Sequence, residues 1–237
     1  MAGAVTAGAA LLFAQVTSFP AQAEMRGISF TGFTEISVRA GLDMRVEVGP
    51  EFSIEMEGKG AAIDTVDIHL EGATLVVDRK RGWRETLLSW SSDDRKVTVH
   101  VAAPTLDGVT ADAGASVTVS GVVEHALRAE AFAGAAMALT GINGAALDIV
   151  ADAGASVVAA GTCSEMAVRA SGGASVYAAN LDCATAIAEA SGGASVIVSA
   201  HETLSLQASG GGSLIASGGG VVLRQEASSG GSLIVQP

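Results

Sequence analysis

Short runs of alternating apolar and polar residues cover the chain from about residue 28 to residue 101. Met44, Val46 and Val48 form one such run, and Val97, Val99 and Val101 form another. A period of two is typical of β-strands that bury one face. No stretch has a convincing helical period of about 3.6 residues, so we expect little helix.

An internal repeat begins at about Thr110. The hexapeptide Asp-Ala-Gly-Ala-Ser-Val occurs at residues 112–117 and 152–157, and Ser-Gly-Gly-Ala-Ser-Val occurs at residues 171–176 and 191–196. Weaker copies bring the total to seven, and the residue before the last apolar position of each copy is Ser116, Ala136, Ser156, Ser175, Ser195, Ser213 and Ser232. Successive copies are 18 to 20 residues apart. Apolar positions recur in the same register, which a Gly/Ser linker would not show.

This period predicts an all-β fold, a parallel β-helix with Gly-rich turns between short strands. We expect residues 24–105 to form an irregular N-terminal β portion and residues 106–237 to form about seven coils. The apolar columns on either side of the outward positions would stack inside the coils. With strands about 4.8 Å apart, seven coils make a rod of roughly 30 Å.

The first 23 residues have the features of an export signal. They carry no charge, include the apolar run from Ala9 to Phe13, and end in Ala21-Gln22-Ala23 before Glu24. A small-x-small site after an apolar run predicts signal-peptide cleavage, although the usual basic residues at the start are missing. The alternative is a buried N-terminal strand or helix. We expect a protein of the periplasm, cell surface or medium, with no stable membrane insertion after processing.

The composition excludes several partners and one kind of scaffold. The 237 residues carry a formal net charge of −12, which argues against nucleic acid and anionic membrane surfaces. Two cysteines exclude a disulfide-dense scaffold. Cys163 and Cys183 occupy the same place in adjacent coils, about 5 Å apart, so they form either a disulfide or a pair of stacked thiols.

One outward column of the repeat becomes apolar along the chain. After Thr118 and Ala138, it consists of Val158, Tyr177, Ile197, Ile215 and Ile234, which we call the apolar stripe. An outward column on a one-sided strand should face water. The stripe is therefore either covered, by the N-terminal strands or a neighbouring molecule, or exposed as an interaction site.

The C-terminal coil is a candidate for self-association. Leu233, Ile234 and Val235 directly precede Gln236 and Pro237. A solenoid normally needs a polar cap at its end. We expect this end to meet another copy or a partner.

The segment of residues 78–96, called the basic loop below, is a second candidate binding feature. It contains Arg79, Arg81, Trp83, Arg84 and Trp90, in a chain that is otherwise acidic. Arginine beside an aromatic ring is typical of protein contact sites and of sugar-stacking sites. The alternative is an ordinary hairpin whose tryptophans pack on the sheet.

Catalytic chemistry finds little support. Some β-helices act on polysaccharides, but such sites need carboxylates clustered with Lys or Arg. All three lysines precede residue 97, and the four histidines have no metal-ligand spacing. We expect no catalytic residues, no metal and no cofactor.

The order of these features resembles the bacterial auto-transporter adhesin head (GIN-type) domain family. The resemblance runs from about residue 28 to residue 235 and is carried by residues 33–38, 43–48, 72–77 and 97–106, followed by the Gly-Ala-Ser-Val repeats. It implies an exported, right-handed β-helix with an adhesive function. We expect a non-catalytic adhesin-like binding protein or surface scaffold that binds a protein or glycan. A periplasmic structural or sensing module is the alternative, and a polysaccharide-active enzyme is disfavoured.

Overall fold

The computed structural model describes residues 24–84, 95–144 and 146–236, so the predicted signal peptide and Trp90 lie outside the described residues. The described chain contains the short helix α1 (Gly60–Ile63) and eighteen strands. The strands are β1 (Glu24–Ile28), β2 (Glu35–Val38), β3 (Asp43–Val48), β4 (Ser53–Gly58), β5 (Val66–Glu71), β6 (Thr74–Arg79), β7 (Val97–Ala103), β8 (Gly108–Ala111), β9 (Ser116–Gly121), β10 (Leu127–Ala131), β11 (Ala136–Asn143), β12 (Leu147–Ala151), β13 (Ser156–Ala170), β14 (Ser175–Ala190), β15 (Ser195–Ala208), β16 (Ser213–Ser217), β17 (Val221–Ala227) and β18 (Ser232–Val235).

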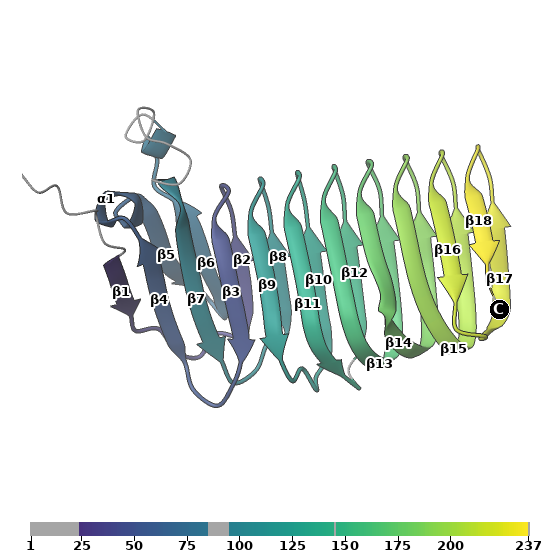
Figure 1. The fold of residues 1–237 in the computed structure, drawn as a ribbon, viewed down its shortest axis with the longest axis horizontal. Coiled ribbons are helices and arrows are strands. Elements are labelled where there is room, and N and C mark those ends of the chain that lie inside the picture. The colour runs from purple at the N-terminus through teal and green to yellow at the C-terminus, as the bar shows by residue number, and fades with distance from the viewer. Residues whose placement is uncertain (1–23, 85–94, 145, 237) are drawn as a thin grey trace, which may run out of the picture.

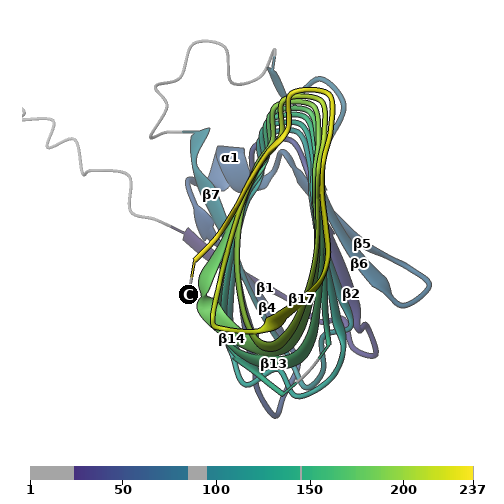
Figure 2. The same cartoon turned by 90° about the vertical axis from the view of Figure 1, so that its right-hand side faces the viewer.

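These strands form two walls of a β-solenoid that lies lengthwise in Figure 1 and is seen end-on in Figure 2. Wall A has the order β1-β4-β7-β3-β9-β11-β13-β14-β15-β16-β18. Wall B has the order β5-β6-β2-β8-β10-β12-β13-β14-β15-β17. The long strands β13, β14 and β15 contribute to both walls. The predicted all-β solenoid is therefore confirmed.

The N-terminal strands continue the walls out of sequence order. Strand β3 pairs in parallel with β7 on one side and β9 on the other. Strand β2 likewise lies between β6 and β8. The coil formed by β2 and β3 is thus inserted between two later coils, while β1, β4 and β5 pair in antiparallel fashion. This insertion and these antiparallel strands make up the irregular N-terminal portion that the alternation pattern predicts.

The repeat copies stack in register. All seven outward positions from Ser116 to Ser232 are successive partners on wall A. Passing from the first to the seventh takes about six turns of the solenoid. Each turn returns the chain to the same position one strand further along, so one residue type recurring in the repeat becomes a column on the surface or in the core.

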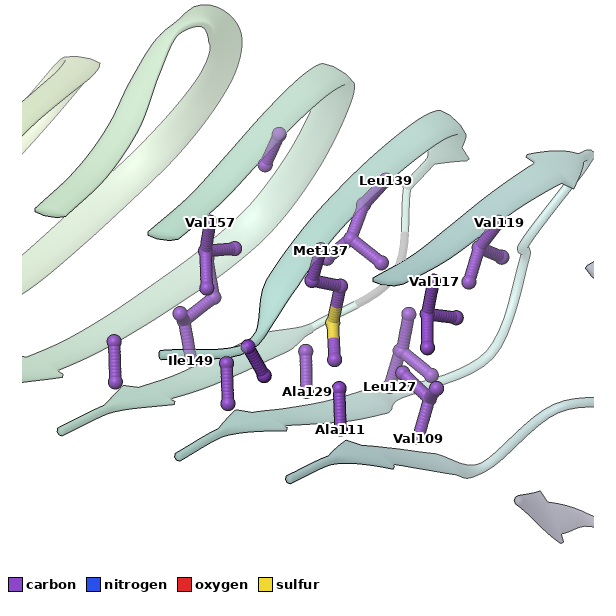
Figure 3. Packing of buried hydrophobic residues seen from close by; sticks show 14 of the residues in the cluster. Val109, Ala111, Val117, Val119, Leu127, Ala129, Met137, Leu139, Ile149 and Val157 are labelled. Atoms are coloured by element: carbon purple, nitrogen blue, oxygen red, sulfur yellow. The ribbon is translucent and has the colours of Figure 1, made fainter. Parts of the chain in front are cut away.

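The core is a thin layer between the two walls (Figure 3). Val117, Met137 and Val157 point inward from wall A, and Leu127 and Ile149 point inward from wall B; all are at most 3% exposed. Near the turns the walls converge, and there the buried side chains shrink to alanine, as at Ala111, Ala131, Ala151, Ala170, Ala190 and Ala208. A core poor in aromatic residues fits this narrow cross-section.

The turns from wall B to wall A demand positive φ at two successive residues. In the turn after β12 these residues are Ala153 (φ 52°) and Gly154 (φ 76°). The Asp152 carboxylate accepts hydrogen bonds from the Ser171 hydroxyl and the Ala153 backbone N–H, which lower its pKa below the usual value. The Ser171 bond comes from the next coil, so this carboxylate links two turns.

The cysteines lie where the repeat places them. Cys163 and Cys183 are register partners on β13 and β14, with Cα atoms 4.4 Å apart. Both are buried, and their Sγ atoms are joined in a disulfide. The bond connects adjacent coils near the bend from wall A to wall B.

Two glycine substitutions should separate backbone strain from collision between coils. Gly134 (φ 74°) has open space where a Cβ would be, whereas a Cβ on Gly141 (φ 82°) would collide with the carbonyl oxygen of Gly121. We expect Gly134→Ala to cost about 1 kcal/mol in unfolding free energy and Gly141→Ala about 3 kcal/mol or more. Urea denaturation measures both. Equal losses would contradict this account of the packing between coils.

Candidate functional site

The apolar stripe is a continuous column on the outside of wall A. Val158, Tyr177, Ile197, Ile215 and Ile234 are successive register partners. Val158, Tyr177 and Ile234 are 43%, 41% and 50% exposed, and the other two are partly exposed. None of the described strands lies over them. The N-terminal strands extend the walls edge to edge instead of covering the stripe.

Toward the N-terminal end the same column becomes polar and charged. Its register partners there are Thr118, Arg45, His100 and Glu55. The rod therefore presents one wall with a charged end and an apolar end. Exposed apolar positions in a row are unusual on a soluble surface and indicate a contact site.

In the basic loop, Arg79 connects the two ends of the loop to the region of helix α1. It is half-buried, and its guanidinium donates hydrogen bonds to Thr65 Oγ1 (2.6 Å) and to the carbonyl oxygen of Arg95 (2.9 Å). Thr65 in turn donates to the carbonyl of Ala62 in α1. Burial, and secondarily the charge of Arg95, lowers the pKa of Arg79. Arg79 thereby connects both ends of the loop to the helix.

Trp83 contacts cationic side chains of its own chain. The guanidinium carbons of Arg79 and Arg84 lie 4.9 Å and 5.4 Å from its ring centroid. A cavity of about 400 Å³ beside it is lined also by Arg95, Lys96 and Asp43, of which the last two form an ion pair. Arg81 and Arg84 are exposed. The structure thus brings Arg79, Trp83 and Arg84 together, but with the ring already contacting arginine.

A groove on the outside of wall B was missed by the sequence analysis. It has a volume of about 500 Å³ and a mostly apolar lining. Two outward columns border it, one with Ala126, Ala146, Glu165, Thr185 and Thr203, the other with Arg128, Asp148, Ala167, Ile187 and Ser205. Leu223, 70% exposed, lies at its C-terminal end.

A signal for part of this groove was present in the repeat. Asp148, Ala167 and Ile187 share one register position of wall B, so the column analysis used for the apolar stripe would have found them. Leu223 would have escaped it. The pairing of β15 with β17 shifts register beside this residue, between Leu204 and Ser205, and such irregularities do not follow from a repeat.

The described residues contain no group of three or more His, Cys, Asp or Glu side chains that could hold a metal ion. Nor does the helix in this part of the chain reach the length and apolarity needed to cross a membrane. The C-terminal coil is open to solvent, with every residue of β17 exposed. Self-association through this coil stays a prediction.

The chain is a β-solenoid with flat walls and exposed apolar columns. The family model described as "Putative auto-transporter adhesin, head GIN domain" matches residues 32–220. The chain belongs to this family. No curated protein matches the chain.

Solved structures support the fold. A "putative adhesin" from Bacteroides fragilis is 14% identical with a TM-score of 0.75, covering 90% of this chain and 96% of that one. A "putative adhesin" from Parabacteroides merdae is 14% identical with a TM-score of 0.66, covering 91% and 97%. A "Putative lipid binding protein" from Parabacteroides distasonis is 15% identical with a TM-score of 0.59, also covering 91% and 97%. At these identities the likeness shows the fold alone.

The role of Arg79 can be tested against Arg81. Replacing Arg79 by Ala removes two charge-assisted hydrogen bonds at a half-buried position, and we expect a loss of about 2 kcal/mol in unfolding free energy. Arg81→Ala, at an exposed position, should change it by less than about 0.5 kcal/mol. Urea denaturation followed by tryptophan fluorescence measures both. Similar losses in the two variants would refute the structural role of Arg79.

Proposed function

We propose that the protein is a non-catalytic, exported, adhesin-like binding protein that meets its partner through the apolar stripe on wall A. The observation that carries this proposal is one unbroken register column of five large apolar side chains, three of them exposed and two partly exposed. Their outward direction means that the core does not need them. Membership of an adhesin-head family supports the same function.

Continuous hydrogen bonding between coils suits the rod to this function. A stiff surface loses little conformational freedom on binding, so more of its contact energy appears as affinity. The described part of the basic loop, residues 78–84 and 95–96, lies at the opposite end of the rod from the apolar end of the stripe (Figure 1). Arg81, Arg84 and Trp83 are a second proposed contact surface, for a protein or a glycan, in the same function.

A periplasmic structural or sensing module is the alternative reading of the same surfaces. The two differ in where the mature protein resides. For the adhesin-like function we expect cleavage after Ala23 and protein on the cell surface, accessible to added protease. Fractionation of the source bacterium with sequencing of the mature N-terminus measures both. A protected periplasmic pool would favour the module, and an uncleaved cytoplasmic protein would contradict export.

Binding of an amphiphile is a second candidate function, favoured by the groove on wall B. The groove has the volume of a small-ligand site and a mostly apolar lining. One of the similar structures is described as a "Putative lipid binding protein". This function is independent of the stripe, because the two features occupy opposite walls.

The contact role of the stripe predicts a loss of binding without a loss of fold. We expect Ile197→Lys combined with Ile215→Lys to weaken binding of the labelled protein to bacterial cells by about tenfold or more, since two apolar contacts are replaced by charges. Flow cytometry measures binding. Val150→Lys with Gln207→Lys, at partly buried outward positions of wall B, is the matched control. Unfolding of the stripe variant would show that the stripe supports the core instead.

A further inference from the structure

The groove on wall B has a polar end and an apolar end. Asp107, Arg128 and Asp148 line the part nearest the N-terminal coils, and Glu165 lies on β13, the same strand as Ala167. Further along, the apolar outward side chains are Ala167, Ile187 and Leu223, and the hydroxyl groups of Thr185, Thr203 and Ser205 lie beside them. Ile187 and Leu223 are 54% and 70% exposed, so their apolar surface is not used by the core. An elongated site with this gradient matches a molecule that has a charged head and an apolar tail.

We propose that this groove binds a single-chain amphiphile with a positively charged head group. The alkyl chain lies along Ala167, Ile187 and Leu223, and the head lies on the N-terminal side of Ala167, between Asp107 and Glu165. This assignment rests on the second candidate function and adds to it the class of ligand and its direction in the groove.

The dimensions of the groove fit one alkyl chain. From Arg128 to the C-terminal end of the groove, the column takes five steps from strand to strand. At about 4.8 Å a step, this is roughly 24 Å. One acyl chain spans about 15 Å, half the hydrocarbon core of a bilayer. The groove therefore has length for one extended chain and a head group.

The charges at the polar end favour a cation. Arg128 forms a 2.7 Å ion pair with Glu130, which raises the pKa of the guanidinium, and Arg169 forms a 3.1 Å ion pair with Asp148. Within each of these two ion pairs, the positive and the negative charge cancel. Within the described residues Asp107 and Glu165 have no such partner, so two negative charges remain at this end. A carboxylate head would be repelled there, and an ammonium head would be attracted.

Three probes with the same alkyl chain separate the contribution of the head from that of the tail. They are tetradecyltrimethylammonium, tetradecyl maltoside and tetradecanoate, each titrated into the purified mature protein below its critical micelle concentration. We expect the cationic probe to bind most tightly, the neutral one less tightly, and tetradecanoate about tenfold or more weakly than the cationic one. Isothermal titration calorimetry at low and moderate salt measures the affinities, and salt should reduce the preference.

Substitutions assign each end of the groove. Ile187→Asn with Leu223→Asn should weaken all three probes alike, by about tenfold or more. Asp107→Asn with Glu165→Gln should abolish the preference for the cationic head and leave the neutral probe unchanged. Val158→Asn with Ile234→Asn, which removes similarly exposed apolar side chains from wall A, is the matched control and should change nothing. Circular dichroism verifies that each variant is folded.

The possible results distinguish the two levels of this proposal. Binding of all three probes with equal affinity would overturn the cationic head group and leave amphiphile binding standing. Absence of binding by every probe would overturn both. Equal loss in the wall A control would mean that the probes adhere to any exposed apolar side chain, and this too would overturn the groove as the site.

Discussion

The structure depends on one constraint, the in-register hydrogen bonding of each coil to the next. Once the chain has completed a coil, every backbone N–H and C=O of the next strand finds its partner only if the coil length is kept. That is why the copies remain 18 to 20 residues apart. The constraint also explains the turns, where two successive positive φ angles reverse the chain in the least space. A carboxylate such as Asp152 can then reach the hydroxyl of the next coil.

Register turns single residue choices into extended surfaces. A repeat position that is apolar in five successive coils becomes the apolar stripe, and one that changes from Asp148 through Ala167 to Ile187 becomes a groove with two different ends. The outward column of the stripe is charged near the N-terminal coils and apolar further along, whereas wall B keeps charged residues such as Arg169 and Glu189 beside the groove. The proposed binding function needs no deep pocket, since the surface chemistry is distributed along the rod.

The N-terminal portion supplies what the repeat lacks. Insertion of β2 and β3 between later coils joins the start of the chain to the walls by parallel pairing on both sides. Helix α1 packs Ala62 and Ile63 into the core, and Arg79 connects the helix region to the loop beside it. Arg79 therefore has a structural role, and the recognition proposed for the described part of the loop involves Arg81, Arg84 and Trp83.

The sequence by itself determined the parts of this protein that repeat. Alternation predicts the strands, and the period predicts the solenoid. Counting from the outward positions Ser116 to Ser232 places Cys163 beside Cys183 and aligns the apolar stripe, because the number of residues per coil is nearly constant. Only the tertiary structure decided the parts that break the repeat. Three examples are the order β7-β3-β9, the contact of Trp83 with arginine and the position of Leu223. Each depends on which segments, distant in the sequence, pair at the same strand edge or pack in the same space. No local sequence pattern predicts which of these arrangements forms, since the packing energies of both walls together decide which one is the most stable.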